Sequence, residues 1–220
     1  MAAGDITDAL VDRVRNRIGE PSKQGVLDEE IHAYLSFAQR DIAMRLNEAA
    51  IPELTPVTSG SLSSSRATLP SDLQRIRVLQ VGTNGYPARR WPVVWRDALS
   101  NNSLVNPSAE EPYYWLWYNT TAAAVVLNVE IDDATSTADY DLHYVETPAD
   151  VDTDTDPQLS TRWHGLMVDL AVALARSAKG EWGEYDRVRR KYLSRARVQN
   201  NRYSGRGLRA LDEEPGDVGG

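Results

Sequence analysis

The sequence predicts an α+β fold, in which an antiparallel bundle of about four helices carries an inserted small β subdomain and ends in an extended C-terminal arm. Apolar residues recur with the helical period in residues 5–49, with the strand period in 66–146, and with the helical period again in 160–199. Each predicted helix has a single apolar face, and such helices bury that face by packing together.

The N-terminal part is expected to form two helices, over residues 5–18 and 28–49. In the first, an apolar side chain falls at every fourth position, at Ile6, Leu10, Val14 and Ile18. Asp28 stands where the second helix begins, and an aspartate there is a favoured N-cap.

The middle of the chain is expected to be β-rich. It begins with TPVTSGSLSSSRATLP, whose dense serine and glycine predict a mobile loop. The stretches YYWLWYN and AVVLNVEI that follow are rich in aromatic and β-branched residues, which favour strands. Between the strands, residues 95–101 are expected to form one short helix.

Two further helices are predicted over residues 160–179 and 184–199, and the chain beyond Asn200 is polar and glycine-rich. The predicted organisation is N-terminal bundle helices in 1–55, a β-rich insertion in 56–148, C-terminal bundle helices in 149–200, and an extended or disordered arm in 201–220.

The composition narrows the function classes. The chain has no cysteine, which excludes thiol catalysis, disulfides and thiolate zinc sites. No apolar run reaches the length of a membrane span, and the first residues do not resemble a secretory signal, so we expect a cytosolic protein or a particle assembled in the cytosol.

Charge is unevenly distributed along the chain, whose net charge is -8. Residues 160–210 hold 12 Lys and Arg against 4 Asp and Glu, whereas residues 211–220 hold 4 acidic residues and no basic ones. Such asymmetry is typical of a chain that contacts a charged partner near one end.

Motifs for catalysis are absent from the sequence. The three histidines are widely spaced, and neither a phosphate-binding glycine loop nor a nucleophile elbow occurs. We therefore expect a protein that is not an enzyme, with no cofactor, no catalytic residue and no metal site.

Four aspartates alternate in DVDTDTDP, at Asp150, Asp152, Asp154 and Asp156. Neither register supplies the glycine and closing glutamate of a calcium loop, so an acidic, stiffened connection between the β subdomain and the bundle is favoured over an ion site. Weak ion binding stays open.

The aromatic run EEPYYWLWYN allows two interpretations. Trp115 and Trp117 would share one strand face, where exposed rings could stack on sugars or bases. The favoured interpretation is that the rings form the core of the subdomain or a protein interface, because the chain has a single phenylalanine.

The basic stretch RVRRKYLSRARVQ leaves three interpretations open. Arg187, Arg190, Lys191 and Arg195 share a broad helix face, which suits nucleic acid, an acidic protein surface, or solvent alone.

The order of these segments resembles the head-to-tail adaptor (connector) proteins of tailed double-stranded DNA phages. Leu69-Pro70-Ser71-Asp72-Leu73 resembles their LP-x-D-hydrophobic motif at the start of a strand, and Tyr144 with Thr147-Pro148 resembles their Y-x-x-x-P at the end of the sheet. The similarity extends over roughly residues 5–200 and rests on the order and spacing of short motifs.

The resemblance implies a structural virion protein of the head–tail junction, assembled in the host cytoplasm and without a membrane partner. In such adaptors a ring of about twelve subunits lies under the portal protein, extends the DNA channel, and offers a platform to the next tail component, a nozzle, stopper or tail completion protein, and to tail fibres. Genomic DNA would pass through the channel without sequence-specific binding.

Carried onto this chain, the resemblance implies two sets of contact residues. The portal-docking candidates are Arg187, Arg189, Arg190, Lys191, Arg195, Arg197, Arg202, Tyr203, Arg206, Leu208, Arg209 and Leu211. The tail-facing or intersubunit candidates are Ser61, Leu62, Ser63, Ser64, Asn84, Tyr86, Trp115 and Trp117. The alternatives are a carbohydrate-binding module using Trp115 and Trp117, and a basic-helix nucleic-acid binder. The resemblance assigns no role to the acidic residues 212–220.

Overall fold

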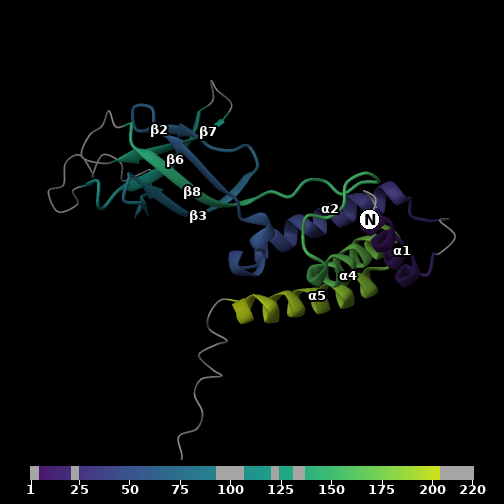
Figure 1. Cartoon of the computed structure of the whole chain (residues 1–220). Coiled ribbons are helices and arrows are strands. Elements are labelled where there is room, and N and C mark those ends of the chain that lie inside the picture. The colour runs from purple at the N-terminus through teal and green to yellow at the C-terminus, as the bar shows by residue number, and fades with distance from the viewer. Residues whose placement is uncertain (1–4, 21–24, 93–106, 120–123, 131–136, 204–220) are drawn as a thin grey trace, which may run out of the picture. The chain divides into compact units, whose positions relative to one another are not determined.

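The computed structural model describes residues 5–20, 25–92, 107–119, 124–130 and 137–203 (Figure 1). The chain is α+β, as predicted, and its described parts contain four α-helices and two small sheets. It divides into two compact units, one formed by Met1–Leu54 with Thr147–Gly220 and the other by Thr55–Glu146. The predicted helix at 95–101 lies outside the described residues.

The helical unit is organised around one central helix. It contains α1 (Asp5–Ile18), α2 (Asp28–Arg45), α4 (Thr161–Ala178) and α5 (Trp182–Tyr203), with 3-10 turns η1 (Glu48–Ala50) and η2 (Pro52–Leu54) after α2. Helix α4 packs against each of the other three (Figure 1). It can do so because apolar residues occupy most of its circumference, including Trp163, Met167, Leu170 and Ala171, all of which are buried.

The end of α2 and its N-cap differ from the prediction. Helix α2 ends at Arg45 rather than at 49, because Leu46 is extended and the Asn47 side chain accepts a hydrogen bond from Ala49 N, which starts a 3-10 turn instead. The predicted N-cap was also wrong. Leu27 is the N-cap of α2, Glu30 accepts a hydrogen bond from Leu27 N at 2.8 Å, and Asp28 pairs with the buried Arg15 of α1.

The polar stretch after residue 199 also differs from the prediction over its first part. Helix α5 continues to Tyr203, so residues 201–203 are helical rather than an extended or disordered arm. Gly180, with φ of +77°, provides the predicted break between α4 and α5, a left-handed backbone that glycine adopts without steric cost.

The segment with the four aspartates is fastened to the helical unit. Val151 and Leu159 are buried, Val151 N donates to Ser36 Oγ at 2.9 Å, and Gln39 of α2 bonds to the backbone of both Ala149 and Leu159. Polar side chains of α2 thus form hydrogen bonds with backbone N–H and C=O groups of a segment that is neither helix nor strand.

The β unit is built from two four-stranded sheets. The first has the order β1 (Val57–Ser61), β8 (Asp139–Glu146), β3 (Leu73–Val81) and β4 (Tyr86–Pro87), and all its pairs are antiparallel. The second has the order β2 (Arg66–Thr68), β7 (Ala124–Glu130), β6 (Tyr113–Asn119) and β5 (Arg89–Arg90), in which β5 pairs parallel with β6. Side chains of both sheets meet in one core that includes Leu79, Tyr114, Leu127 and Leu142.

The serine-rich stretch is a strand and a tight turn, so the predicted mobile loop was wrong. Strand β1 pairs with β8, and Ser59 and Ser61 donate side-chain hydrogen bonds to Asp141 and Asp139 of β8 at 2.5 and 2.6 Å. The chain then turns at Ser64 and Ser65, which both have positive φ, and continues into β2.

The ion pairs of Asp169 give a first prediction. Asp169 of α4 is buried and pairs with Arg17 of α1, at 2.7 Å, and with Arg195 of α5. We expect Asp169→Asn to lower the free energy of unfolding of the helical unit by about 2 kcal/mol, because two arginines lose their counter-charge while remaining partly exposed to water. Urea unfolding followed by far-UV circular dichroism measures the change. The control Asp186→Asn, on the exposed surface of α5, should stay within about 0.5 kcal/mol of the original protein, and an equal loss in both variants would contradict the prediction.

His164 gives a second prediction, on pH. Burial lowers the pKa of His164, and the nearby Arg13 charge lowers it further, whereas the hydrogen bond with the Leu159 carbonyl oxygen and the charge of Asp156 oppose the shift. Because the unfolded chain then takes up the proton more readily, the free energy of unfolding should fall as the pH drops below about 6.5. His164→Gln should flatten this dependence between about pH 7.5 and 5.5, and an unchanged slope would show that His164 does not cause it.

Candidate functional site

Helix α5 has a basic surface opposite its buried stripe. Its buried residues, Val188, Tyr192 and Ala196, recur at every fourth position and form a narrow stripe that packs on α4 and α2. From Arg187 to Tyr203 the helix contains no acidic residue, so its remaining surface is basic.

A buried hydrogen bond anchors this helix to α2. Tyr192 Oη donates to Asp41 Oδ2 at 2.5 Å, and Arg45 binds the same carboxylate with Nε at 2.5 Å and Nη2 at 2.9 Å. Burial and the Asp41 contact raise the pKa of Tyr192, so the phenol stays protonated and keeps donating. The hydrogen bond to Asp41 likewise raises the pKa of Arg45.

A second anchor holds α5 to α4. Arg195 pairs with the buried carboxylate of Asp169, which also receives Arg17 from α1. Because Tyr192 bonds to Asp41 and Arg195 pairs with Asp169, the rotation of α5 about its own axis is fixed. The side chains that point outward are fixed as a consequence.

The exposed basic face of α5 consists of Arg187, Arg189, Arg190, Lys191, Arg197 and Arg202. Three of these have contacts along the helix. Arg187 pairs with Glu184 at 2.6 Å, Arg190 Nε donates to the Asp186 carbonyl oxygen at 3.2 Å, and Arg189 lies 5.9 Å from the Tyr185 ring centre. Within the described ranges, Lys191, Arg197 and Arg202 form no ion pair. The face therefore keeps an uncompensated positive charge.

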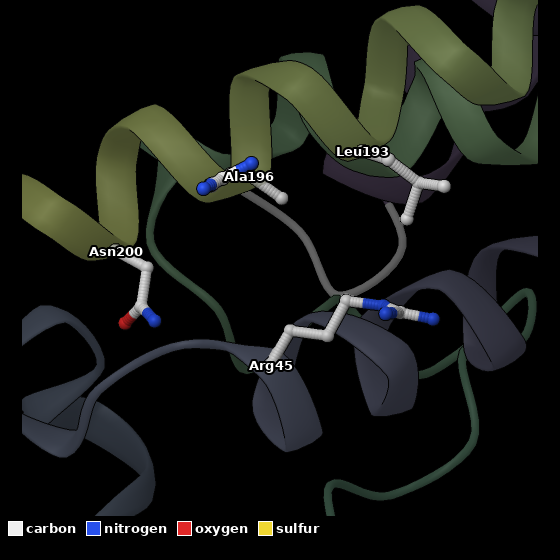
Figure 2. A pocket seen from close by; sticks show the side chains of 5 residues that line it. Arg45, Leu193, Ala196 and Asn200 are labelled. Carbon is white, nitrogen blue, oxygen red and sulfur yellow. The ribbon is translucent and has the colours of Figure 1, made fainter.

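A hollow of about 230 Å³ lies at the edge of this face (Figure 2). Arg45 of α2 stands on one side of it, and Leu193, Ala196, Arg197 and Asn200 of α5 form the other. Asn200 also closes the end of α2, because its side-chain oxygen accepts Asn47 N at 2.7 Å. Arg45 is already bound to Asp41, whereas Arg197 forms no ion pair within the described residues, so the hollow suits an acidic side chain that pairs with Arg197.

The portal-docking candidates fall into three groups. The basic face contains six of them, and Tyr203 is exposed at the end of the helix, with its ring 6.3 Å from that of Trp163. Arg195 is partly exposed, but its guanidinium pairs with the buried Asp169, a structural role that sequence reasoning missed. Arg206, Leu208, Arg209 and Leu211 lie outside the described residues.

The tail-facing candidates all belong to the β unit. Leu62 is only 2% exposed and belongs to the core, so its side chain offers no surface to a partner. Ser61, Ser63, Ser64 and Asn84 are exposed in or beside turns, and Tyr86 is half-buried in β4.

The aromatic strand β6 is buried at its beginning and exposed at its end. Tyr113 and Tyr114 are buried, Tyr114 in the core of the unit, whereas Trp117 and Tyr118 are 52% and 55% exposed. Trp115 is half-buried, so only one of the two tryptophans named for sugar stacking is openly available. The burial of Tyr113 and Tyr114 agrees with the interpretation that rings of this run belong to the core of the subdomain, but burial changes along the strand rather than between its two faces. The interpretation of the remaining rings as a protein interface stays a prediction.

Three of the four aspartates use their carboxylates on separate partners rather than on a shared centre. Asp150 pairs with Arg40 of α2 at 2.5 Å, Asp152 accepts Asp154 N at 2.8 Å, and Asp156 accepts Thr7 N at 3.0 Å. The hydrogen bond from Asp154 N is the main reason that the pKa of Asp152 lies below its usual value. Within the described ranges, no three His, Asp or Glu side chains are grouped so as to hold a metal ion.

None of the helices in the described parts of the chain combines the length and the hydropathy of a membrane span.

Comparison with known proteins gives a family match. Among curated proteins, none matches the chain. A family model described as SU10 adaptor protein matches residues 5–216, which is nearly the whole sequence. The chain therefore belongs to the SU10 adaptor protein family, which is consistent with its resemblance to the head-to-tail adaptors of tailed phages.

Proposed function

We propose that the protein is a head-to-tail adaptor at the head–tail junction of the virion, assembled in the host cytoplasm. Its subunits form a ring of about twelve under the portal protein, extend the DNA channel, and provide the platform to which the tail attaches. Membership of an adaptor family supports a structural virion role, in which contact surfaces rather than catalytic groups do the work.

The two parts of the chain have separate tasks in this proposal. The helical unit is the antiparallel bundle that builds the wall of the ring, and the β unit is an insertion in the chain between its two pairs of helices. A net charge of -8 suits a channel through which DNA slides without sequence-specific binding, since an acidic wall repels phosphates.

The basic face of α5 is the portal-docking surface in this proposal, together with Tyr203 and the segment from Arg206 to Leu211. The observation that carries this assignment is the absence of acidic residues from Arg187 to Tyr203 on a helix whose rotation is fixed by Tyr192 and Arg195. A fixed array of outward cations recognises an acidic protein surface at short range and steers the encounter at long range.

The β unit faces the next tail component, a nozzle, stopper or tail completion protein, and the tail fibres. Trp117 and Tyr118 at the exposed end of β6 fit a protein contact, since aromatic side chains are enriched in interface cores. Ser61, Ser63, Ser64 and Asn84 would line the turns around it.

Charge reversal on α5 tests the docking assignment. We expect Lys191→Glu with Arg197→Glu to weaken binding to the isolated portal ring by at least about 100-fold, because two attractions become repulsions. Neither side chain is buried or paired within the described residues, so the helical content should stay unchanged. Binding is measured by biolayer interferometry at two salt concentrations, with circular dichroism as the folding control.

A matched variant separates a local contact from a change in net charge. Arg13→Glu with Arg66→Glu changes the net charge equally at exposed positions on α1 and β2, and it should bind the portal within about threefold of the original protein. Equal losses in both variants would sink the assignment of α5. If α5 instead served nucleic acid, the reversal would abolish salt-sensitive DNA binding and leave portal binding intact.

A further inference from the structure

The acidic residues that close the sequence complement the basic face of α5. Asp212, Glu213, Glu214 and Asp217 fall within six positions, and no Lys or Arg lies among them or after them. The exposed surface of α5 from Arg187 to Tyr203 has the opposite composition, with basic side chains and no acidic ones. The two segments are separated by residues 204–211 alone.

The connecting residues are long enough for the two segments to meet. Eight residues span at most about 28 Å when extended. A helix rises about 1.5 Å per residue, so Arg190 lies about 20 Å before Tyr203 along α5. The acidic residues can therefore reach any part of the basic face from Arg190 onward. A short tether also gives them an effective concentration in about the millimolar range.

The hollow beside α5 lies within reach of the acidic residues. Arg197 stands at its rim without an ion pair in the described part of the chain, about two turns before Tyr203. The Asp41 carboxylate already balances Arg45, so the unmatched charge belongs to Arg197 and its exposed neighbours Arg190 and Lys191. Leu193 and Ala196 supply an apolar floor for the stems of glutamate side chains.

We infer that the acidic segment 212–217 binds back onto the basic face of α5 in the free subunit, with the hollow at Arg197 as its main site. The contact is a set of charge-assisted interactions at the surface, so it weakens with salt and exchanges rapidly. Any polyanion or acidic protein that uses α5 must first displace this segment. If the proposed function is right, the portal is that competitor, and the segment keeps free subunits from binding polyanions indiscriminately.

A competition assay tests the inference without a portal. The variant D212N/E213Q/E214Q/D217N removes the four charges, and its affinity for a fluorescent 20-nucleotide single-stranded DNA, used only as a polyanion, is measured by anisotropy. We expect the variant to bind about tenfold more tightly than the original chain at low salt, and the difference to vanish at high salt.

The control variant carries the same change in net charge elsewhere. D8N/D12N/E29Q/D154N neutralises four exposed acidic residues of the helical unit, and it should improve binding by less than about threefold. Equal gains in both variants would mean that only net charge matters, and would overturn the inference. The same holds if the first variant shows no gain.

A spin label tests the contact itself. Since the chain has no cysteine, Gly216→Cys provides a single attachment site for a nitroxide. The label should broaden the amide signals of residues 190–197 at low salt, and the broadening should disappear at high salt or when the four acidic residues are neutralised. Broadening confined to the last turn of α5 under all conditions would contradict the inference, and it would leave the portal-docking proposal untouched.

Discussion

The helical unit depends on one buried carboxylate. Asp169 lies in the middle of α4, which packs against each of the other three helices, and pairs with Arg17 from α1 and Arg195 from α5. Burying an unpaired charge costs free energy, so the native packing places α1 and α5 where Arg17 and Arg195 can pair with Asp169. Burial of the apolar side chains of α4 favours a compact unit, whereas the pairing of Asp169 favours one particular packing of α1 and α5 on α4.

The same requirement recurs at the other helix contacts. The buried Arg15 of α1 pairs with Asp28 of α2. Within α2, Asp41 pairs with Arg45, and the same carboxylate accepts a hydrogen bond from Tyr192 of α5. Satisfied polar groups inside a bundle favour one packing over near alternatives, because each wrong register leaves a charge unpaired. For α5 the consequence is that the orientation set by Tyr192 and Arg195 determines which side chains form its outer face.

Periodicity made most of the fold predictable. The stripe at Leu10 and Val14, and the apolar run from Leu166 to Ala175, depend on local pattern alone and gave the right helices. Strand β1 escaped prediction because its pairing comes from β8, where Asp139 and Asp141 accept hydrogen bonds from serines that would otherwise favour a loop. Leu62 was misplaced for the same reason, since the fold rather than the local sequence buries it.

The candidate site was predictable only in part. The basic residues of α5 were visible as a charge run, and their helical spacing showed that they share a face. Sequence reasoning did not separate Arg195, which is tied to Asp169, from Lys191 and Arg197, which are not paired within the described residues. The one signal was Asp169 itself, a lone acidic residue inside the apolar run LMVDLAVALA, which calls for a basic partner from elsewhere in the chain.

We propose that the orientation of α5 presents a docking surface for the portal at the head–tail junction. Electron microscopy of the isolated junction, with the portal in place, can show this surface. We expect a ring in which the outer face of α5, from Arg187 to Arg202, lies against acidic portal side chains, and in which Arg195 remains paired with Asp169 of its own subunit. A ring in which α5 is remote from the portal, or a junction that lacks this protein, would contradict it.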